Sequence, residues 1–118
     1  MENKITEVHV TQFAEDDLIE IVDYYESINK GYVEKIISEF ETNVMSLKDF
    51  PYSGRIVPEL YRQGIENYRE LIQGYYRIVY EIIENVVYVI SIIDGRRNFE
   101  DIIISKLTHY LERKDGNK

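Results

Sequence analysis

The chain has 118 residues, of which 44% are hydrophobic and 31% charged, so it predicts one globular domain over residues 1–118 and excludes a disordered chain. No apolar run approaches the roughly 20 residues of a membrane-spanning helix, and the lack of cysteine excludes disulfides and thiolate chemistry. The net charge of −8 is unfavourable for long-range attraction to nucleic acid. The N-terminus has neither the basic start nor the apolar stretch of a signal peptide, so we expect a cytoplasmic protein.

The charge is distributed unevenly along the sequence. Residues 1–50 carry twelve Asp and Glu against four Lys, a balance of −8, and contain no arginine. Residues 51–118 carry ten acids against ten bases, a balance of zero. This half holds all the arginines of the chain: Arg55, Arg62, Arg69, Arg77, Arg96, Arg97 and Arg113. Because arginine is suited to planar recognition of carboxylates and phosphates, we expect a partner to bind the second half.

The first half predicts a strand followed by two helices. Residues 4–11 alternate in part and favour a strand, after which Thr11 is placed as a helix N-cap. Apolar residues then recur at helical spacing until the break at residues 29–31. A second helical stripe covers residues 33–47 and stops before Pro51. Two helices with so short a link predict an antiparallel αα-hairpin.

The second half predicts a loop, three strands and a last helix. The loop covers residues 51–67, with a short helical turn around residues 59–63. The strands are predicted over residues 68–73, 75–84 and 86–93, and the last is apolar on both faces, as a central strand would be. Asn98 can cap the final helix, and residues 113–118 form a polar tail that we expect to be frayed.

The predicted fold is therefore an α+β domain of the order β-α-α-β-β-β-α. It has an N-terminal strand, an αα-hairpin, a three-stranded antiparallel meander and a C-terminal helix. Grouping of the helices suggests that they cover one face of the sheet. The other face, which bears Arg77, is expected to be partly open to solvent.

Few residue patterns in the chain favour metal or cofactor chemistry. His9 and His109 lie far apart in the sequence and belong to no cluster with metal-ligand spacing, so we predict no metal and no cofactor. The acids of the first predicted helix are expected to form a solvated face, with a patch for a basic partner as the alternative. They are Glu15, Asp16, Asp17, Glu20, Asp23 and Glu26.

Arg77 has two interpretations. In the first, it is an exposed residue that shares one face of a predicted strand with Tyr75 and Val79, where a cross-strand glutamate pairs with it. Alternatively, it forms an anion site that stabilises the charge developing on a phosphorane. Arg69 and one of the pair at residues 96–97 could converge with it, although period-2 counting places Arg69 on the side of Leu71. Both interpretations stay open at this point.

Four segments taken together resemble the RelE/ParE toxin superfamily of bacterial type II toxin–antitoxin systems, which includes plasmid stabilisation proteins. They are the helical residues 14–25, the stretch 47–55 that ends in Gly-Arg, the strand motifs Arg69-Glu-Leu and Tyr76-Arg-Ile-Val-Tyr80, and residues 89–98 with Gly-Arg-Arg. The resemblance runs from about residue 5 to residue 98. The family fold agrees with the order of elements predicted independently above.

The resemblance implies a toxin that a cognate antitoxin neutralises. The ParE-like branch, which inhibits DNA gyrase, fits the motifs at least as well as the RelE-like branch, and the acidic charge counts against a ribosomal target. The alternative is a RelE-like, ribosome-dependent mRNA endonuclease that needs no metal, with Arg69, Arg77 and Arg97 as its catalytic residues. Acid–base partners for that chemistry would come from Glu70, Glu81 or Asp94. A second alternative is a toxin-like homologue that has lost its activity.

The resemblance also implies where partners bind. The residues expected to contact the target or the antitoxin are Arg55, Tyr75, Arg77, Arg96 and Arg97. The expected partners are the antitoxin and either DNA gyrase or the ribosome with its mRNA, with no membrane involved. A homodimer stays open.

Overall fold

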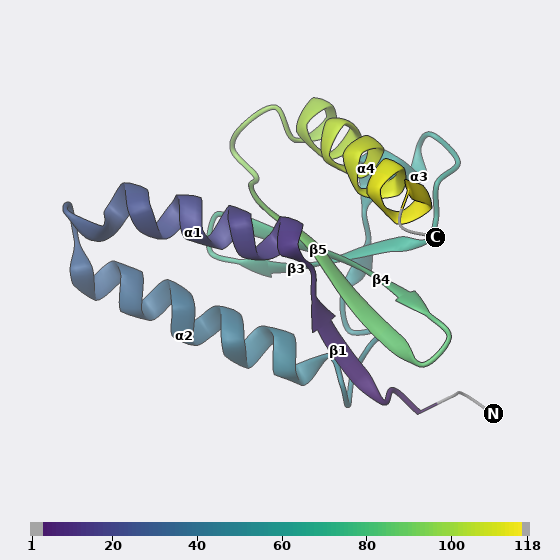
Figure 1. Cartoon of the computed structure of the whole chain (residues 1–118), viewed down its shortest axis with the longest axis horizontal. Helices are drawn as coiled ribbons and strands as arrows, with labels where there is room; N and C mark the ends of the chain where they lie inside the picture. Colours follow the sequence, from purple (N-terminus) through teal and green to yellow (C-terminus); the bar gives the residue numbers. More distant parts are fainter. Residues whose placement is uncertain (1–3, 117–118) are drawn as a thin grey trace.

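The computed structural model describes residues 4–116, which form a five-stranded sheet with helices on both faces (Figure 1). In chain order the elements are β1 (Glu7–Val10), α1 (Gln12–Glu26), α2 (Lys30–Ser46), β2 (Arg55–Ile56), α3 (Pro58–Tyr61), β3 (Tyr68–Gln73), β4 (Tyr76–Ile83), β5 (Val86–Asp94) and α4 (Phe99–Gly116). The α+β class, the helical hairpin and the three-stranded meander are confirmed. None of the described helices is both long and apolar enough to cross a membrane.

The strands lie in the order β1-β5-β4-β3-β2. The meander strands β3, β4 and β5 pair antiparallel, whereas β1 pairs in parallel with β5. The chain reaches this parallel position because the helical hairpin and the strands β2, β3 and β4 lie between β1 and β5 in sequence. β5 has a neighbour on both sides, which confirms the prediction of an inner strand from its continuous apolar sequence.

The hairpin of α1 and α2 packs on one face of the sheet, and its tip extends beyond the strands (Figure 1). Thr11 caps α1 as predicted, because its Oγ1 accepts the N–H of Ala14 at 3.4 Å. The core on this face joins Ile36 and Phe40 of α2 to Tyr80 of β4. Burial of these apolar faces, at roughly 25 cal/mol per Å² removed from water, holds the hairpin in place.

The helix α4 covers the other face of the sheet, so the expectation that helices occupy one face is wrong (Figure 1). Ile103 and Leu107 of α4 pack against Val79 of β4 and Ile90 of β5. The physical reason is that the inner strands are apolar on both faces, and the stripe of α4 buries the second one. This helix continues to Gly116, so the tail that was expected to be frayed is helical up to that residue. Residues 117 and 118 lie outside the described part.

A buried carboxylate ties α1 to both β5 and α4. Asp17 Oδ2 accepts hydrogen bonds from Ser91 Oγ at 2.7 Å and from the Ile92 N–H at 3.0 Å. Its second oxygen forms an ion pair with Lys106 of α4. Placing Asp17 on a solvated face is therefore wrong, whereas the other five acids assigned to that face are exposed. Asp17 falls on the apolar stripe of α1, three residues after Ala14, which was the available signal.

The predicted loop 51–67 contains two short elements, β2 and α3. The helical turn expected at residues 59–63 is α3, and the two-residue β2 was missed because two residues carry no alternation. Two side chains from the meander hold this segment. Tyr80 Oη accepts the Gly54 N–H at 3.0 Å and donates to the Pro51 carbonyl at 2.7 Å, while Arg69 Nη1 donates to the Gly54 carbonyl at 2.7 Å.

Gly54 has no room for a side chain. A Cβ there would lie 2.5 Å from the Glu70 carbonyl oxygen and 2.6 Å from Tyr80 Oη. We therefore expect Gly54→Ala to lower the free energy of unfolding in urea by about 1–3 kcal/mol. The matched control is Gly31→Ala in α2, where a Cβ meets only Asn29 Oδ1 at 3.5 Å. That change should stabilise by about 0.5–1 kcal/mol, and equal stability of the two variants would contradict the packing described.

Candidate interaction site at the arginine turn

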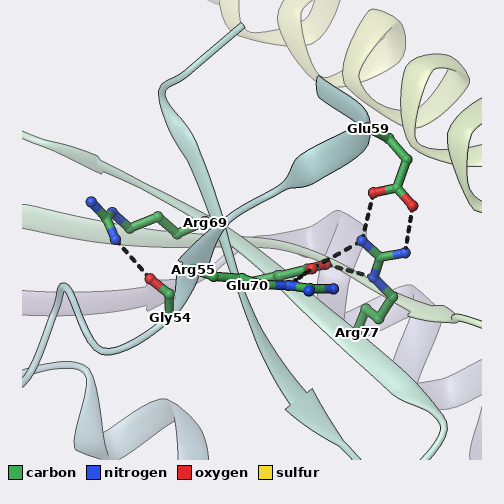
Figure 2. Close-up of polar contacts among 6 residues, drawn as sticks. All are labelled: Gly54, Arg55, Glu59, Arg69, Glu70 and Arg77. Carbon is green, nitrogen blue, oxygen red and sulfur yellow. Dashed lines mark hydrogen bonds and ion pairs between the residues drawn. The ribbon is translucent and has the colours of Figure 1, made fainter. Parts of the chain in front are cut away.

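Arg77 is enclosed by opposite charges and one aromatic ring. Figure 2 shows the charged members Arg55, Glu59, Glu70 and Arg77. With Phe99 they form what is named here the Arg77 cluster. Arg77 Nη1 and Nη2 donate to the two carboxylate oxygens of Glu59 at 2.9 and 2.7 Å. Its Nε donates to Glu70 Oε1 at 2.6 Å, and the guanidinium carbon lies 3.5 Å from the centroid of the Phe99 ring. The Arg77 side chain is only 11% exposed.

The charges of this cluster neutralise one another. Glu70 has a side-chain exposure of 0%, and it is also paired with Arg55 Nε at 2.7 Å. The hydrogen bonds from Arg77 hold the pKa of Glu59 below its usual value despite the opposing effect of burial. Burial opposes the charge of Arg77, but its bonds to Glu59 and Glu70 outweigh this and raise its pKa. Pairing of Arg77 with a glutamate of the neighbouring strand is confirmed, whereas its expected exposure is wrong, because α3 and α4 cover it.

Arg69 lies on the opposite face of the sheet from Arg77. Arg69 stands opposite Tyr80 in the β3–β4 ladder, and Tyr80 belongs to the core under the hairpin. Arg77 stands opposite Ile72, next to Val79, whose side chain packs under α4. The expected convergence of Arg69 with Arg77 is therefore wrong, because neighbouring positions of β3 alternate between faces.

The chain turns sharply after β5, and this turn presents two arginines. We name it the arginine turn; it consists of Tyr75 and residues 94–97. The Gly95 N–H donates to the Tyr75 carbonyl at 2.8 Å, and a Cβ on Gly95 would lie 2.9 Å from Arg77 Cδ. The turn thus lies directly on the aliphatic part of the Arg77 side chain. The Arg77 cluster supports the turn from below.

Arg96 is held in one orientation. Its Nη2 and Nε donate to the two carboxylate oxygens of Asp94 at 2.8 and 3.1 Å, and these bonds keep the pKa of Asp94 below its usual value. Its guanidinium carbon lies 3.9 Å from the centroid of the Tyr75 ring. Tyr75 remains 59% exposed and Arg96 54%. Arg97 is exposed and, within residues 4–116, its side chain is seen in no hydrogen bond or ion pair, although its charge contributes to the lowered pKa of Asp94.

The three carboxylates considered for acid–base chemistry are all engaged in hydrogen bonds or ion pairs within the fold. Glu70 is enclosed by Arg55 and Arg77. Glu81 is buried under α4, where it accepts the Tyr110 hydroxyl at 3.0 Å, and Asp94 holds Arg96. Within the described residues, no three His, Asp or Glu side chains gather closely enough to hold a metal ion. The arrangement is suited to binding a carboxylate or an aromatic group at the surface.

Sequence reasoning missed the residues that support the site. Glu59 lies in a segment read as a loop, and nothing in its neighbours indicates that α3 carries it to Arg77. Phe99 belongs to the apolar stripe of the last helix, where burial was predicted but the contact with a guanidinium was not. Both contacts join residues that are far apart in sequence, so only the folded chain reveals them.

Comparison with known proteins identifies the class. Residues 8–99 match the model of a family described as ParE toxin of type II toxin–antitoxin system, parDE. A solved structure titled "Chromosomal ParDE TA system from P. aeruginosa" is similar, with a TM-score of 0.60 and 18% identity over 76% of this chain and 96% of that chain. No curated protein matches the sequence.

The fold and the matched segment define a toxin of a type II toxin–antitoxin system. Within that class, the chain belongs to the ParE toxin family. The resemblance read from the sequence motifs is thereby confirmed, as is the fold it implied. Membership of this family also implies an antitoxin as partner.

Loss of Arg77 should destabilise the fold strongly. Arg77→Ala removes both bonds to Glu59 and leaves the fully buried Glu70 with Arg55 alone. We expect the free energy of unfolding in urea to fall by about 3–5 kcal/mol, as for other broken buried pairs. The control Arg62→Ala, at an exposed arginine, should stay within about 0.5 kcal/mol of the wild type. Similar values for the two variants would contradict the structural role of Arg77.

The ion pair of Glu59 should make stability depend on pH. Since folding lowers the pKa of Glu59 from 4.5, its contribution is present at neutral pH and is lost as the pH falls through the folded value. Glu59→Gln should therefore be less stable than the wild type at pH 7, and the difference should shrink at pH 3. Urea denaturation at both pH values measures this. An equal difference at pH 7 and pH 3 would rule out the ionised pair as its source.

Proposed function

We propose that this protein is a ParE-type toxin that arrests growth by inhibiting DNA gyrase in the cytoplasm, until its antitoxin neutralises it. The family match supports a toxin, and the state of Arg77 favours a binding mechanism over RNA cleavage. A catalytic arginine must present its donors to the charge that develops on the phosphate. The donors of Arg77 are instead occupied by Glu59 and Glu70. This observation carries the proposal.

On this proposal the target binds the arginine turn. Tyr75, Arg96 and Arg97 project there, and tyrosine and arginine are enriched among the residues that dominate binding energy at protein interfaces. Arg77 acts as a positioning residue, because it supports Gly95 from inside the protein. Arg55 of β2 is 59% exposed and pairs with Glu70, so it presents a further guanidinium beside the Arg77 cluster.

An mRNA endonuclease is the competing function. It would require Arg69, Arg77 and Arg97 to act on one phosphate, but Arg69 lies on the opposite face of the sheet from Arg77. The net charge of −8 also opposes close approach to ribosomal RNA, within the Debye length of about 8 Å. We therefore treat RNA cleavage, and complete loss of activity, as outcomes that the experiment distinguishes.

The decisive experiment combines growth with two purified targets. We expect induced expression without antitoxin to arrest growth, and the purified protein to inhibit DNA supercoiling by gyrase. Transcripts in a translating extract should stay intact. The double variant Arg96→Ala with Arg97→Ala should weaken gyrase inhibition by about tenfold or more if the turn is the contact surface. Arg62→Ala is the matched control and should inhibit like the wild type.

The alternatives give different patterns in the same assays. Cleaved transcripts with unaffected gyrase would replace the proposal with the mRNA endonuclease. Absence of any effect on growth, gyrase and transcripts would indicate a homologue without toxin activity. Gyrase inhibition that is unchanged in the double variant would keep the target but remove the arginine turn as its binding surface.

A further inference from the structure

A cavity of about 420 Å³ opens beside the arginine turn. It lies between α1, the end of β5 and α4, and its lining includes Tyr24, Tyr25, Arg96, Arg97, Ile102 and Lys106. Cavities of this size accommodate small molecules or single side chains of a partner. The cavity therefore adjoins the surface that carries the two exposed arginines of the turn.

The cavity lining combines charged side chains with an apolar and aromatic part. Ile21 of α1, Ile92 and Ile93 of β5, and Ile102 of α4 contribute aliphatic surface. At the rim Tyr24 is 66% exposed, and its ring packs edge to face on Tyr25 with 4.8 Å between centroids. A partly exposed aromatic wall held by its neighbour offers contact area with little loss of side-chain entropy. Such a wall favours an aliphatic or aromatic side chain as the occupant.

The charges around the cavity favour one orientation of the bound segment. Asp17 is paired with Lys106, and Asp94 with Arg96. Glu20 on the α1 side and Arg97 on the opposite side are the lining charges for which no ion pair is found within residues 4–116. An acidic group of the occupant is therefore favoured beside Arg97 and disfavoured beside Glu20.

We propose that this cavity binds an apolar side chain of the antitoxin, and that a neighbouring carboxylate of the same antitoxin segment pairs with Arg97. The inference rests on the proposed function in taking the antitoxin of that system as the occupant. The carboxylate is recognised locally, because salt screens charges that lie farther away than the Debye length of about 8 Å. A segment seated there covers Arg97 and part of Arg96, so it excludes the target from the arginine turn.

Two charge reversals test this orientation of the bound antitoxin segment. We expect Arg97→Glu to weaken binding of the purified cognate antitoxin by about tenfold or more, and Glu20→Lys to strengthen it several-fold. The controls Arg62→Glu and Glu66→Lys make the same charge changes at exposed positions outside the cavity. They should alter the dissociation constant less than about twofold. Isothermal titration calorimetry at two salt concentrations measures all four variants, and urea denaturation verifies that each is folded.

Methyl NMR tests occupation of the cavity directly. With isoleucine methyl groups labelled, antitoxin should shift the signals of Ile21 and Ile102, while Ile83, which lies outside the cavity, should not move. Wild-type affinity in both Arg97→Glu and Glu20→Lys, or unshifted cavity methyls, would overturn the inference. A toxin dimer that dissociates in Arg97→Glu would assign the cavity to a second copy and also overturn it.

The two proposals fail separately. Antitoxin binding that responds to Arg97 and Glu20 as expected, together with unaffected gyrase, would retain the antitoxin site and reject the gyrase target. Inhibition of gyrase together with antitoxin affinity that is unchanged by both substitutions would retain the gyrase target and reject the antitoxin site. Neither the calorimetry nor the NMR experiment contains gyrase, so each result refers to one proposal only.

Discussion

The buried carboxylate of Glu70 is the constraint on which the rest of the site depends. A charge without solvent contact is tolerated only if it is paired and hydrogen-bonded, and Glu70 is held by Arg55 on one side and Arg77 on the other. Arg77 is in turn fixed by Glu59 and by the ring of Phe99. One carboxylate therefore connects β2, α3, β3, β4 and the start of α4. The arginine turn lies on Arg77, so its shape follows from the same network.

The confinement of arginine to the second half has a largely structural explanation. Arg69 satisfies a backbone carbonyl of the segment before β2, while Arg55 and Arg77 neutralise a buried glutamate. A planar guanidinium suits these sites because it donates several hydrogen bonds in fixed directions and stacks on aromatic rings. Arg97 differs, since no such internal role is found for it among the described residues. The uneven composition predicted a binding region, but several of these arginines hold the fold together.

Local periodicity predicted the elements well, and contacts between distant residues could not be predicted. β3 has the bounds expected from the sequence, and β4 begins and ends within one residue of its prediction, because alternation is a property of neighbouring residues. Period-2 counting also placed Arg69 on the side of Leu71 correctly. The second covered face was missed because an apolar stripe shows that a helix is buried without showing against which face. Asp17 was assigned by its charge although its position on the stripe indicated burial.

The difference between Arg77 and Arg97 decides which surface can act without rearrangement. A phosphate that reached Arg77 would have to displace Glu59, whose two oxygens occupy both terminal nitrogens of the guanidinium. Displacement would remove a charge-assisted pair of bonds and strand a partly buried carboxylate, which is unfavourable. Arg97 requires no displacement, and the adjoining cavity supplies apolar contact area beside it. On the proposed arrangement, neutralisation by antitoxin is therefore simple exclusion from a preformed surface, with no change in the toxin fold.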